Sequence, residues 1–210
     1  MIARKRFGQH FLEPAWVVKV VAAIAPGASD DLLEIGPGRG ALTTPLLSRA
    51  RSVTAFEIDR DLAAALTATA PPNLTVVEGD FLESDWLLKH RPAHPLRVVG
   101  NLPYNVASPI LFRLIDIFDS GIPLTDATVM LQREVADRLV ARPGTKEYGV
   151  LSVLVRVSAD VERLLTLPAG AFRPVPKVQS ALVRLRFHPP APVRSEEHTS
   201  ELQPRFGISY

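Results

Sequence analysis

Short apolar segments alternate with segments of helical periodicity along most of this 210-residue chain, and this alternation restricts its fold more than any other feature. Repeated strand–helix units join neighbouring parallel strands, because each helix carries the chain back across the sheet. The predicted strands are residues 31–35, 52–57, 74–77, 96–99, 127–131, 161–167 and 181–187. The predicted helices are residues 13–25, 60–70, 109–118, 133–140 and 148–158, with one more that ends near residue 49.

The last two predicted strands have no crossover helix between them, only a loop that includes residues 172–177. Strands joined in this way pair antiparallel. We therefore predict an α/β fold with a doubly wound, mainly parallel seven-stranded sheet of Rossmann-like topology and an antiparallel edge strand.

Composition is compatible with one domain that has a substantial core, because 47% of the residues are hydrophobic and 22% are charged. The chain has no cysteine, which excludes disulfides, thiolate metal sites and cysteine nucleophiles. Its formal net charge of +2 permits nucleic-acid binding without indicating it. No apolar run reaches the about 18 residues of a membrane span, and the N-terminus has no signal-peptide pattern, so we expect a cytoplasmic protein without a membrane partner.

A glycine-rich turn, residues 34–41, follows the first predicted strand of the sheet. Glycines allow a sharp turn and a close approach of a ligand to the backbone. Glu57 ends the next strand, where an acidic side chain commonly binds ribose hydroxyls. Gly36, Gly38 and Ala41 also satisfy the dinucleotide fingerprint, so the turn alone leaves the ligand open.

Two residues of this turn disfavour a dinucleotide. Pro37 removes an N–H group that would otherwise face a pyrophosphate. The Glu34 carboxylate repels phosphates but suits an ammonium or sulfonium group. The alternative is a tight strand–helix turn that binds nothing.

Asn101-Leu102-Pro103-Tyr104 follows the apolar strand 96–99, where open α/β sheets place their chemistry. The Asn101 amide oxygen can accept from an exocyclic N–H, the Tyr104 ring can stack on a base, and Pro103 orients the Leu102 carbonyl. After the third strand, Asp80 can accept from an adenine amino group and Phe81 can lie along the ring. The alternative for Asp80 is a helix N-cap.

These features occur together in one known family. The matching stretches are residues 5–12, 34–38, 57–59, 79–80, 101–105, 130–141, 146–153 and 171–178. On these motifs the chain resembles the ribosomal RNA adenine dimethyltransferases, the KsgA/RsmA family, from residue 4 to about residue 188. The combination is specific, whereas the glycine turn alone is a weak signal.

The resemblance implies S-adenosylmethionine as methyl donor, with no metal. It also implies dimethylation of the N6 atoms of two adjacent adenines in 16S rRNA, with the 30S ribosomal subunit as partner of a monomeric enzyme. The Asn101 and Leu102 oxygens would accept from the target amine, while Tyr104 and Phe172 would stack on its ring. The implied catalytic residues are Asn101, Leu102, Tyr104 and Phe172. The implied donor-binding residues are Gln9, His10, Leu12, Gly36, Gly38, Glu57, Ile58, Asp80, Phe81 and Asn101.

The family also carries a small helical C-terminal domain, and this chain ends before it. We therefore expect donor binding but poor methylation of assembled 30S subunits. We assign residues 1–193 to the methyltransferase domain. Residues 194–203 resemble the in-frame translation of a sequencing adapter, so we interpret residues 194–210 as a disordered, artefactual tail, with an ordinary disordered tail as the alternative.

Three other functions remain open at this stage. An Erm-type 23S rRNA adenine methyltransferase shares the donor motifs. A non-catalytic assembly factor, or a relative acting in transcription, would keep the fold for RNA or DNA binding. A nicotinamide oxidoreductase would use the same glycine turn, but nothing in the chain resembles a hydride-transfer site.

Overall fold

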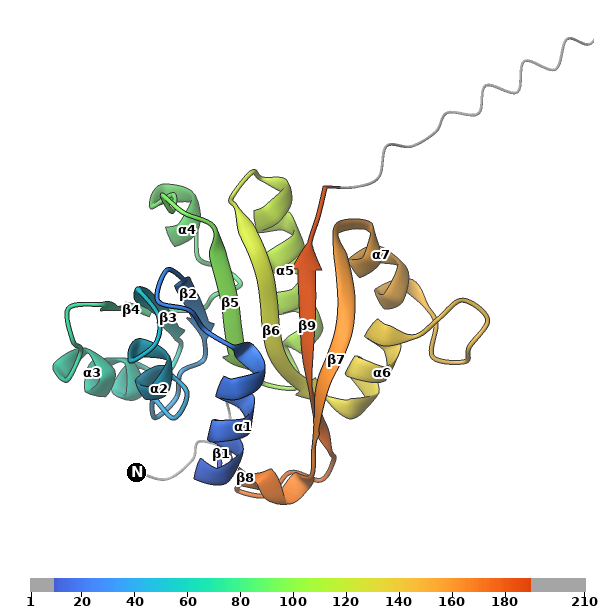
Figure 1. Ribbon diagram of the computed structural model, residues 1–210, viewed down its shortest axis with the longest axis horizontal. Coiled ribbons are helices and arrows are strands. Elements are labelled where there is room, and N and C mark those ends of the chain that lie inside the picture. The colour runs from blue at the N-terminus through green and yellow to red at the C-terminus, as the bar shows by residue number, and fades with distance from the viewer. Residues whose placement is uncertain (1–9, 190–210) are drawn as a thin grey trace, which may run out of the picture.

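The computed structural model describes residues 10–189, which form one seven-stranded sheet in the order β4-β3-β2-β5-β6-β9-β7 and a separate two-stranded pair, β1-β8 (Figure 1). The strands of the main sheet are β2 (Asp31–Ile35), β3 (Ser52–Glu57), β4 (Leu74–Glu78), β5 (Leu96–Asn101), β6 (Leu124–Gln132), β7 (Ala159–Leu167) and β9 (Ser180–Phe187). The small pair consists of β1 (Phe11–Leu12) and β8 (Phe172–Arg173).

Helices cover both faces of this sheet, with α1 in front of it and α5 behind it in Figure 1. The helices are α1 (Pro14–Ile24), α2 (Thr43–Leu47), α3 (Arg60–Ala68), α4 (Trp86–Lys89), α5 (Ala107–Asp119), α6 (Arg133–Val140) and α7 (Val150–Ser158). The doubly wound α/β architecture predicted from the sequence is thus confirmed. The short helix α4 was not predicted, because four residues are too few to show a helical period.

The five strands from β2 to β6 pair in parallel, as predicted, and β9 pairs antiparallel with both β6 and β7. The expected antiparallel pairing of the last two strands is therefore confirmed. The prediction placed the antiparallel strand at the edge of the sheet. In the structure the antiparallel strand β9 lies one place inside the edge, and β7 forms the edge. Without a crossover helix, β9 returns beside β7 and fills the space between β7 and β6.

The register of the central strands brings their carboxyl ends together. Ile35 in β2 stands opposite Phe56 in β3 and Gly100 in β5. Loops that follow these three strands must therefore begin at the same edge of the sheet. This edge is where the sequence placed its candidate ligand-binding residues.

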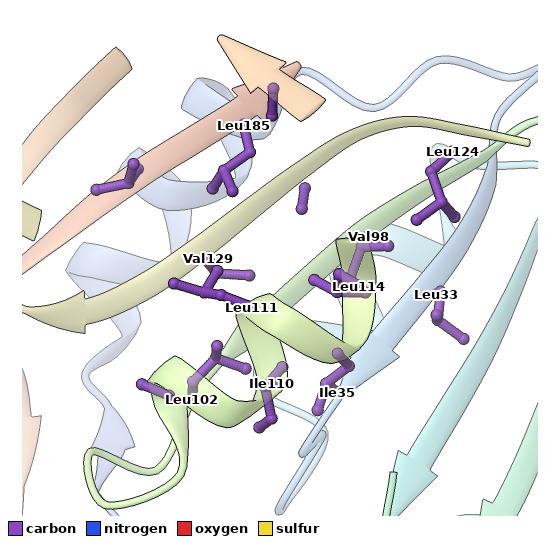
Figure 2. Close-up of a cluster of buried hydrophobic side chains, with 14 of the residues drawn as sticks. Leu33, Ile35, Val98, Leu102, Ile110, Leu111, Leu114, Leu124, Val129 and Leu185 are labelled. Carbon is purple, nitrogen blue, oxygen red and sulfur yellow. The ribbon is translucent and has the colours of Figure 1, made fainter. Parts of the chain in front are cut away.

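The core has two layers because alternate strand residues point to opposite faces. Leu33 and Ile35 join a cluster with α5, shown in Figure 2, while Leu32 joins a second cluster with α1 and α2. Burial on both faces explains why the central strands appear in the sequence as nearly continuous apolar runs. The same packing holds the strands whose carboxyl ends carry the site.

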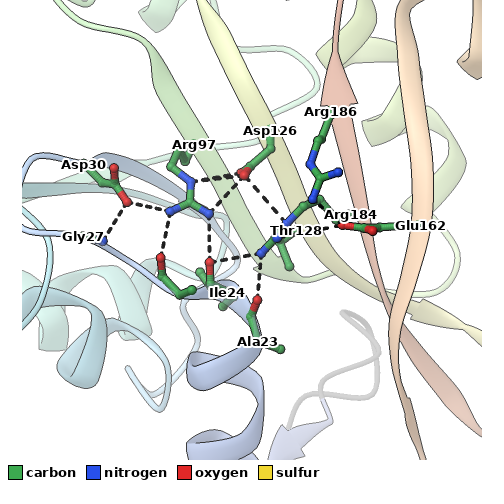
Figure 3. Close-up of polar contacts among 11 residues, drawn as sticks. Ala23, Ile24, Gly27, Asp30, Arg97, Asp126, Thr128, Glu162, Arg184 and Arg186 are labelled. Carbon is green, nitrogen blue, oxygen red and sulfur yellow. Dashed lines mark hydrogen bonds and ion pairs between the residues drawn. The ribbon is translucent and has the colours of Figure 1, made fainter.

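The C-terminal end of α1 is attached to the sheet by a group of charged side chains (Figure 3). Arg97 donates to the Ile24 carbonyl oxygen at 2.8 Å and forms ion pairs with Asp30 at 2.6 Å and Asp126 at 3.0 Å. Arg184 donates to the Ala23 carbonyl oxygen at 2.7 Å. Cationic donors stabilise the negative end of the helix dipole. Because β1 leads directly into α1, this attachment also holds the segment that borders the site.

Candidate active site

The glycine turn joins β2 to α2 and is bonded to the end of β3. Gly36 and Gly38 have φ values of 70° and 60°, in the left-handed region that favours glycine. The Gly36 amide donates to the Phe56 carbonyl oxygen over 2.9 Å. The Gly38 amide donates to Oε2 of Glu57, also over 2.9 Å. The turn and Glu57 therefore form one unit, as their spacing in the sequence predicted.

The loop after β5 lies directly beside this turn. A Cβ atom at Gly100 would stand 2.6 Å from the Ile35 carbonyl oxygen, so only glycine permits this approach. A Cβ atom at Gly36 would lie 3.9 Å from the Asn101 carbonyl oxygen. The glycine turn and the Asn101 loop, both predicted to bind ligands, thus lie side by side.

The segment before α1 completes the site from a third direction. The side-chain amide of Asn101 donates to the His10 carbonyl oxygen over 2.7 Å. The Phe11 ring lies against Gly38, where a Cβ atom would be 3.3 Å from Cε1 of the ring. Nδ1 of His10 is 2.7 Å from the carbonyl oxygen of Pro174, in the loop after β8. Segments more than 160 residues apart therefore meet at His10.

These three segments surround a pocket that is open to solvent. Most of the predicted site residues line it: His10, Leu12, Gly36, Gly38, Glu57, Ile58, Asn101, Leu102 and Tyr104. Glu34, Pro37 and Phe11 also line it. The predicted site residue Gln9 lies outside the part of the chain that the structure describes.

Asp80 and Phe81 do not line this pocket. Oδ1 of Asp80 accepts from the Leu82 amide over 2.9 Å, so its side chain organises its own turn. Phe81 is buried, with its ring edge-on to Phe56 at 5.3 Å between centroids. Asp80 nevertheless stays at the same edge of the sheet, because the preceding Gly79 amide donates to the Glu57 carbonyl oxygen over 2.9 Å.

Phe172, expected to stack on a target base, is 0% exposed in the structure. It packs in the same cluster as Leu12, and its backbone pairs with Leu12 through β1 and β8. Neither face of the ring is open to a base in this arrangement. This differs from the expectation for a physical reason: the pairing of β8 with β1 turns the ring into the core, and that pairing is not visible in the local sequence.

Two carboxyl groups give the pocket a strongly acidic character. Glu34 is 1% exposed, and burial raises its pKa to about 7; the Thr43 hydroxyl acts against this rise, and the nearby Glu57 charge adds to it. Within residues 10–189, Oε2 of Glu34 has no hydrogen-bond partner. A buried oxygen without a partner is costly unless a ligand supplies a donor. Glu34 therefore fits a cationic ligand, as its residue type suggested.

Glu57 is also buried, and burial raises its pKa. Both of its oxygens accept backbone hydrogen bonds, Oε2 from Gly38 and Oε1 from Asp59, each at 2.9 Å. These two bonds favour the ionised form and fix the side chain. A carboxylate held in this way has lone pairs left to accept from hydroxyl groups.

Tyr104 lines the pocket from the loop that follows β5. Its ring is stacked on His10, with centroids 5.7 Å apart and planes 24° from parallel. Its hydroxyl is 2.7 Å from Oγ of Ser180, and burial raises the pKa of the phenol. Ser180 was not predicted as a site residue. The only available signal was its place directly before the last predicted strand, 181–187, and close after the loop 172–177.

Comparison with known proteins decides the family. The family model described as ribosomal RNA adenine dimethylase matches residues 2–202. The chain belongs to the ribosomal RNA adenine dimethylase family.

Curated relatives of this dimethylase support the same assignment. Ribosomal RNA small subunit methyltransferase A from Acidithiobacillus ferrooxidans is 49% identical over 190 residues, which cover 90% of this chain and 70% of the relative. The protein of the same name from Acinetobacter baylyi is 46% identical over 198 residues, which cover 93% of this chain and 71% of the relative. The dimethylase thus spans about 70% of the length of these relatives.

Two solved structures share the fold of this dimethylase at more than 25% identity. A dimethyladenosine transferase from Plasmodium falciparum has a TM-score of 0.74 at 30% identity, with 85% of this chain and 64% of that chain covered. The 23S rRNA methyltransferase ErmE has a TM-score of 0.71 at 32% identity, with 86% and 71% covered. The Rossmann-like methyltransferase fold and the membership of a methyltransferase family are therefore established.

No helix among residues 10–189 has the length and apolar content needed to cross a membrane. Within the same residues, no group of three or more histidine or acidic side chains is placed to hold a metal ion.

Proposed function

We propose that this dimethylase transfers methyl groups from S-adenosylmethionine to the N6 atoms of two adjacent adenines in 16S rRNA. One observation carries the proposal. The amide-bearing loop at Asn101 adjoins the glycine turn, so two acidic groups and an aromatic ring line a single pocket. Such a pocket suits a cationic methyl donor and a flat base that meet at one amide. The activity implies the 30S subunit as partner and the cytoplasm as the compartment.

The pocket fits the donor at three points. The unpartnered Glu34 oxygen can accept from the ammonium group of the methionine moiety or attract the positive sulfonium. Glu57, held by Gly38 and Asp59, can accept from the ribose hydroxyls. The open backbone at Gly36 leaves room for the methionine portion. When bound, the donor supplies a methyl group that is already activated by its sulfonium.

The protein's remaining task is alignment of the acceptor. Adenine N6 is a poor nucleophile because its lone pair is delocalised into the ring. The Asn101 amide nitrogen is used in the bond to His10, so the amide oxygen remains to accept from N6, together with the Leu102 carbonyl oxygen. These acceptors would stabilise the positive charge that develops on N6. The proton can leave after methyl transfer, so no strong base is required.

The target base must leave its stack to reach this pocket, which costs a few kcal/mol and is easiest in RNA loops. Tyr104 offers an aromatic surface to the extruded adenine. Two transfers to one N6 require that the pocket also admits the monomethylated amine.

The relatives named above favour the small-subunit RNA. Identities of 46–49% connect the chain with proteins named ribosomal RNA small subunit methyltransferase A. The test is incubation of the protein and S-adenosylmethionine with unmodified 30S and 50S subunits, followed by mass-spectrometric mapping of methylated adenines. We expect two adjacent dimethylated adenines in 16S rRNA, formed slowly on assembled 30S subunits. Methylation of 23S rRNA alone would indicate the Erm-type activity, and calorimetric binding of NAD but not of S-adenosylmethionine would refute a methyltransferase.

A further inference from the structure

Ser180 is a buried residue that touches the site without lining it. It is the first residue of β9, and its backbone stands opposite Gln132 in β6 and Leu167 in β7. Ser180 is 0% exposed, and its Oγ atom lies 2.7 Å from the Tyr104 hydroxyl. A strand paired on both sides is among the most rigid supports a fold can offer.

Tyr104, by contrast, lies in the irregular loop between β5 and α5. Its hydroxyl is the end of the side chain farthest from the backbone. A hydrogen bond at that end therefore restricts both side-chain torsions and fixes the plane of the ring. The two hydroxyls also satisfy each other, and removal of either would leave the other in a low-dielectric environment without this partner.

The position of Ser180 in the sheet separates it from the acidic side of the pocket. The order β3-β2-β5-β6-β9 places Glu34 and Glu57 on one side of Asn101 and Ser180 on the other. A change at Ser180 should therefore affect what Tyr104 touches and leave the glycine turn undisturbed.

We propose that Ser180 is a positioning residue for the target nucleobase, which acts by fixing the Tyr104 ring and contributes to capture of the adenine rather than to binding of the methyl donor. The inference rests on the proposed function of the pocket. It adds a residue in β9 that does not touch either ligand. It also gives the Tyr104 hydroxyl a task that is separate from stacking.

The experiment is a double-mutant cycle of Ser180→Ala and Tyr104→Phe, assayed on unmodified 30S subunits. Each single variant should raise KM for the subunits about tenfold, the loss expected for one hydrogen bond, with kcat changed less than about threefold. The double variant should also show about a tenfold rise, because both changes remove the same bond. The calorimetric Kd for S-adenosylmethionine should stay within about twofold, because the acidic side is untouched.

Ser158→Ala is the matched control, since Ser158 is also buried but lies just before the other end of β7. It should leave KM unchanged. A rise in KM of about a hundredfold in the double variant would overturn the inference, because the two changes would then act independently. A loss of donor affinity that accompanies the rise in KM would also overturn it. If the unmodified protein binds S-adenosylmethionine but methylates no adenine of 16S rRNA, not even slowly, the proposed function fails separately.

A second readout does not depend on RNA. Tyrosine labelled with ¹³C at the ζ position reports the pKa of the phenol by NMR, and the Tyr104 signal is assigned by its loss in Tyr104→Phe. The hydrogen bond between the Tyr104 and Ser180 hydroxyls lowers this pKa against the effect of burial. Ser180→Ala should therefore raise the Tyr104 pKa, and Ser158→Ala should not. An unchanged pKa in Ser180→Ala would show that Ser180 does not hold the ring.

Discussion

The side-chain amide of Asn101 donates to the backbone carbonyl oxygen of His10 over 2.7 Å, which fixes the direction in which its own oxygen faces the pocket. Asn101→Asp keeps the shape but places an oxygen opposite the His10 carbonyl. The two oxygens repel, so the side chain must turn. We expect the single-turnover methylation rate to fall about 100-fold, as when an aligned polar group is removed from an active site. Donor affinity, measured by calorimetry, should fall less than about fivefold; a rate within threefold of the unchanged protein would contradict the assigned role.

Gly100 permits the contact between β5 and β2 at the site. In Gly100→Ala the new methyl group would stand 2.6 Å from the Ile35 carbonyl oxygen, so the two backbones must separate. We expect a loss of about 1–3 kcal/mol in the free energy of unfolding and a larger proportional loss of methylation. Gly170→Ala is the control, because a Cβ there meets no atom within 4 Å. If Gly100→Ala and Gly170→Ala unfold at the same urea concentration, the contact between Gly100 and the Ile35 carbonyl oxygen is not tight.

Glu34 should make the ligand-free protein less stable as pH rises. Burial raises its pKa from 4.5 in model compounds to about 7, so between these values the folded protein binds more protons than the unfolded chain. Stability from this group is therefore lost as pH rises from about 4.5 to about 7. Relative to Glu34→Gln, the unchanged protein should lose about 2–3 kcal/mol between pH 5 and pH 8 in urea unfolding. Glu78→Gln, at an exposed position, should show no such difference; a pH-independent difference for Glu34→Gln would contradict the burial of an unpartnered acid.

Arg97 should contribute far more to stability than a surface arginine. It joins Asp30 and Asp126 to the end of α1, and its side chain is only 14% exposed. Arg97→Met leaves these carboxylates without their main partner, and we expect a loss of about 2–4 kcal/mol in the free energy of unfolding. Arg51→Met breaks the more exposed pair with Asp31 and should cost less than about 1 kcal/mol. Similar losses in both variants would show that the attachment of α1 does not depend on Arg97.

The sheet and most of the pocket lining were predictable because their determinants are local. Central parallel strands such as β5 appear as apolar runs, and the turn after β2 needs glycines at fixed positions. Asn101 and Glu57 follow directly from these elements, since the carboxyl ends of parallel strands meet at one edge.

Long-range pairing explains what the sequence did not reveal. β1 and β8 have two residues each and stabilise each other only through their pairing, so no periodicity marks them. That pairing buries Phe172, which in sequence resembles an aromatic residue of an exposed loop. The bond between Tyr104 and Ser180 joins residues 76 positions apart and was equally invisible.

If the donor and the target adenine meet at Asn101 in one pocket, a single ligand that links the two should occupy both binding positions. The ligand is an adenosine joined through N6, by a short linker, to the sulfur position of the demethylated donor, with its Kd measured by calorimetry. We predict binding at least about 100-fold tighter than that of the demethylated donor alone, with most of the gain lost in Tyr104→Ala. Equal affinity for the linked and the unlinked ligand would contradict the account, because the adenosine would then have no site beside the donor.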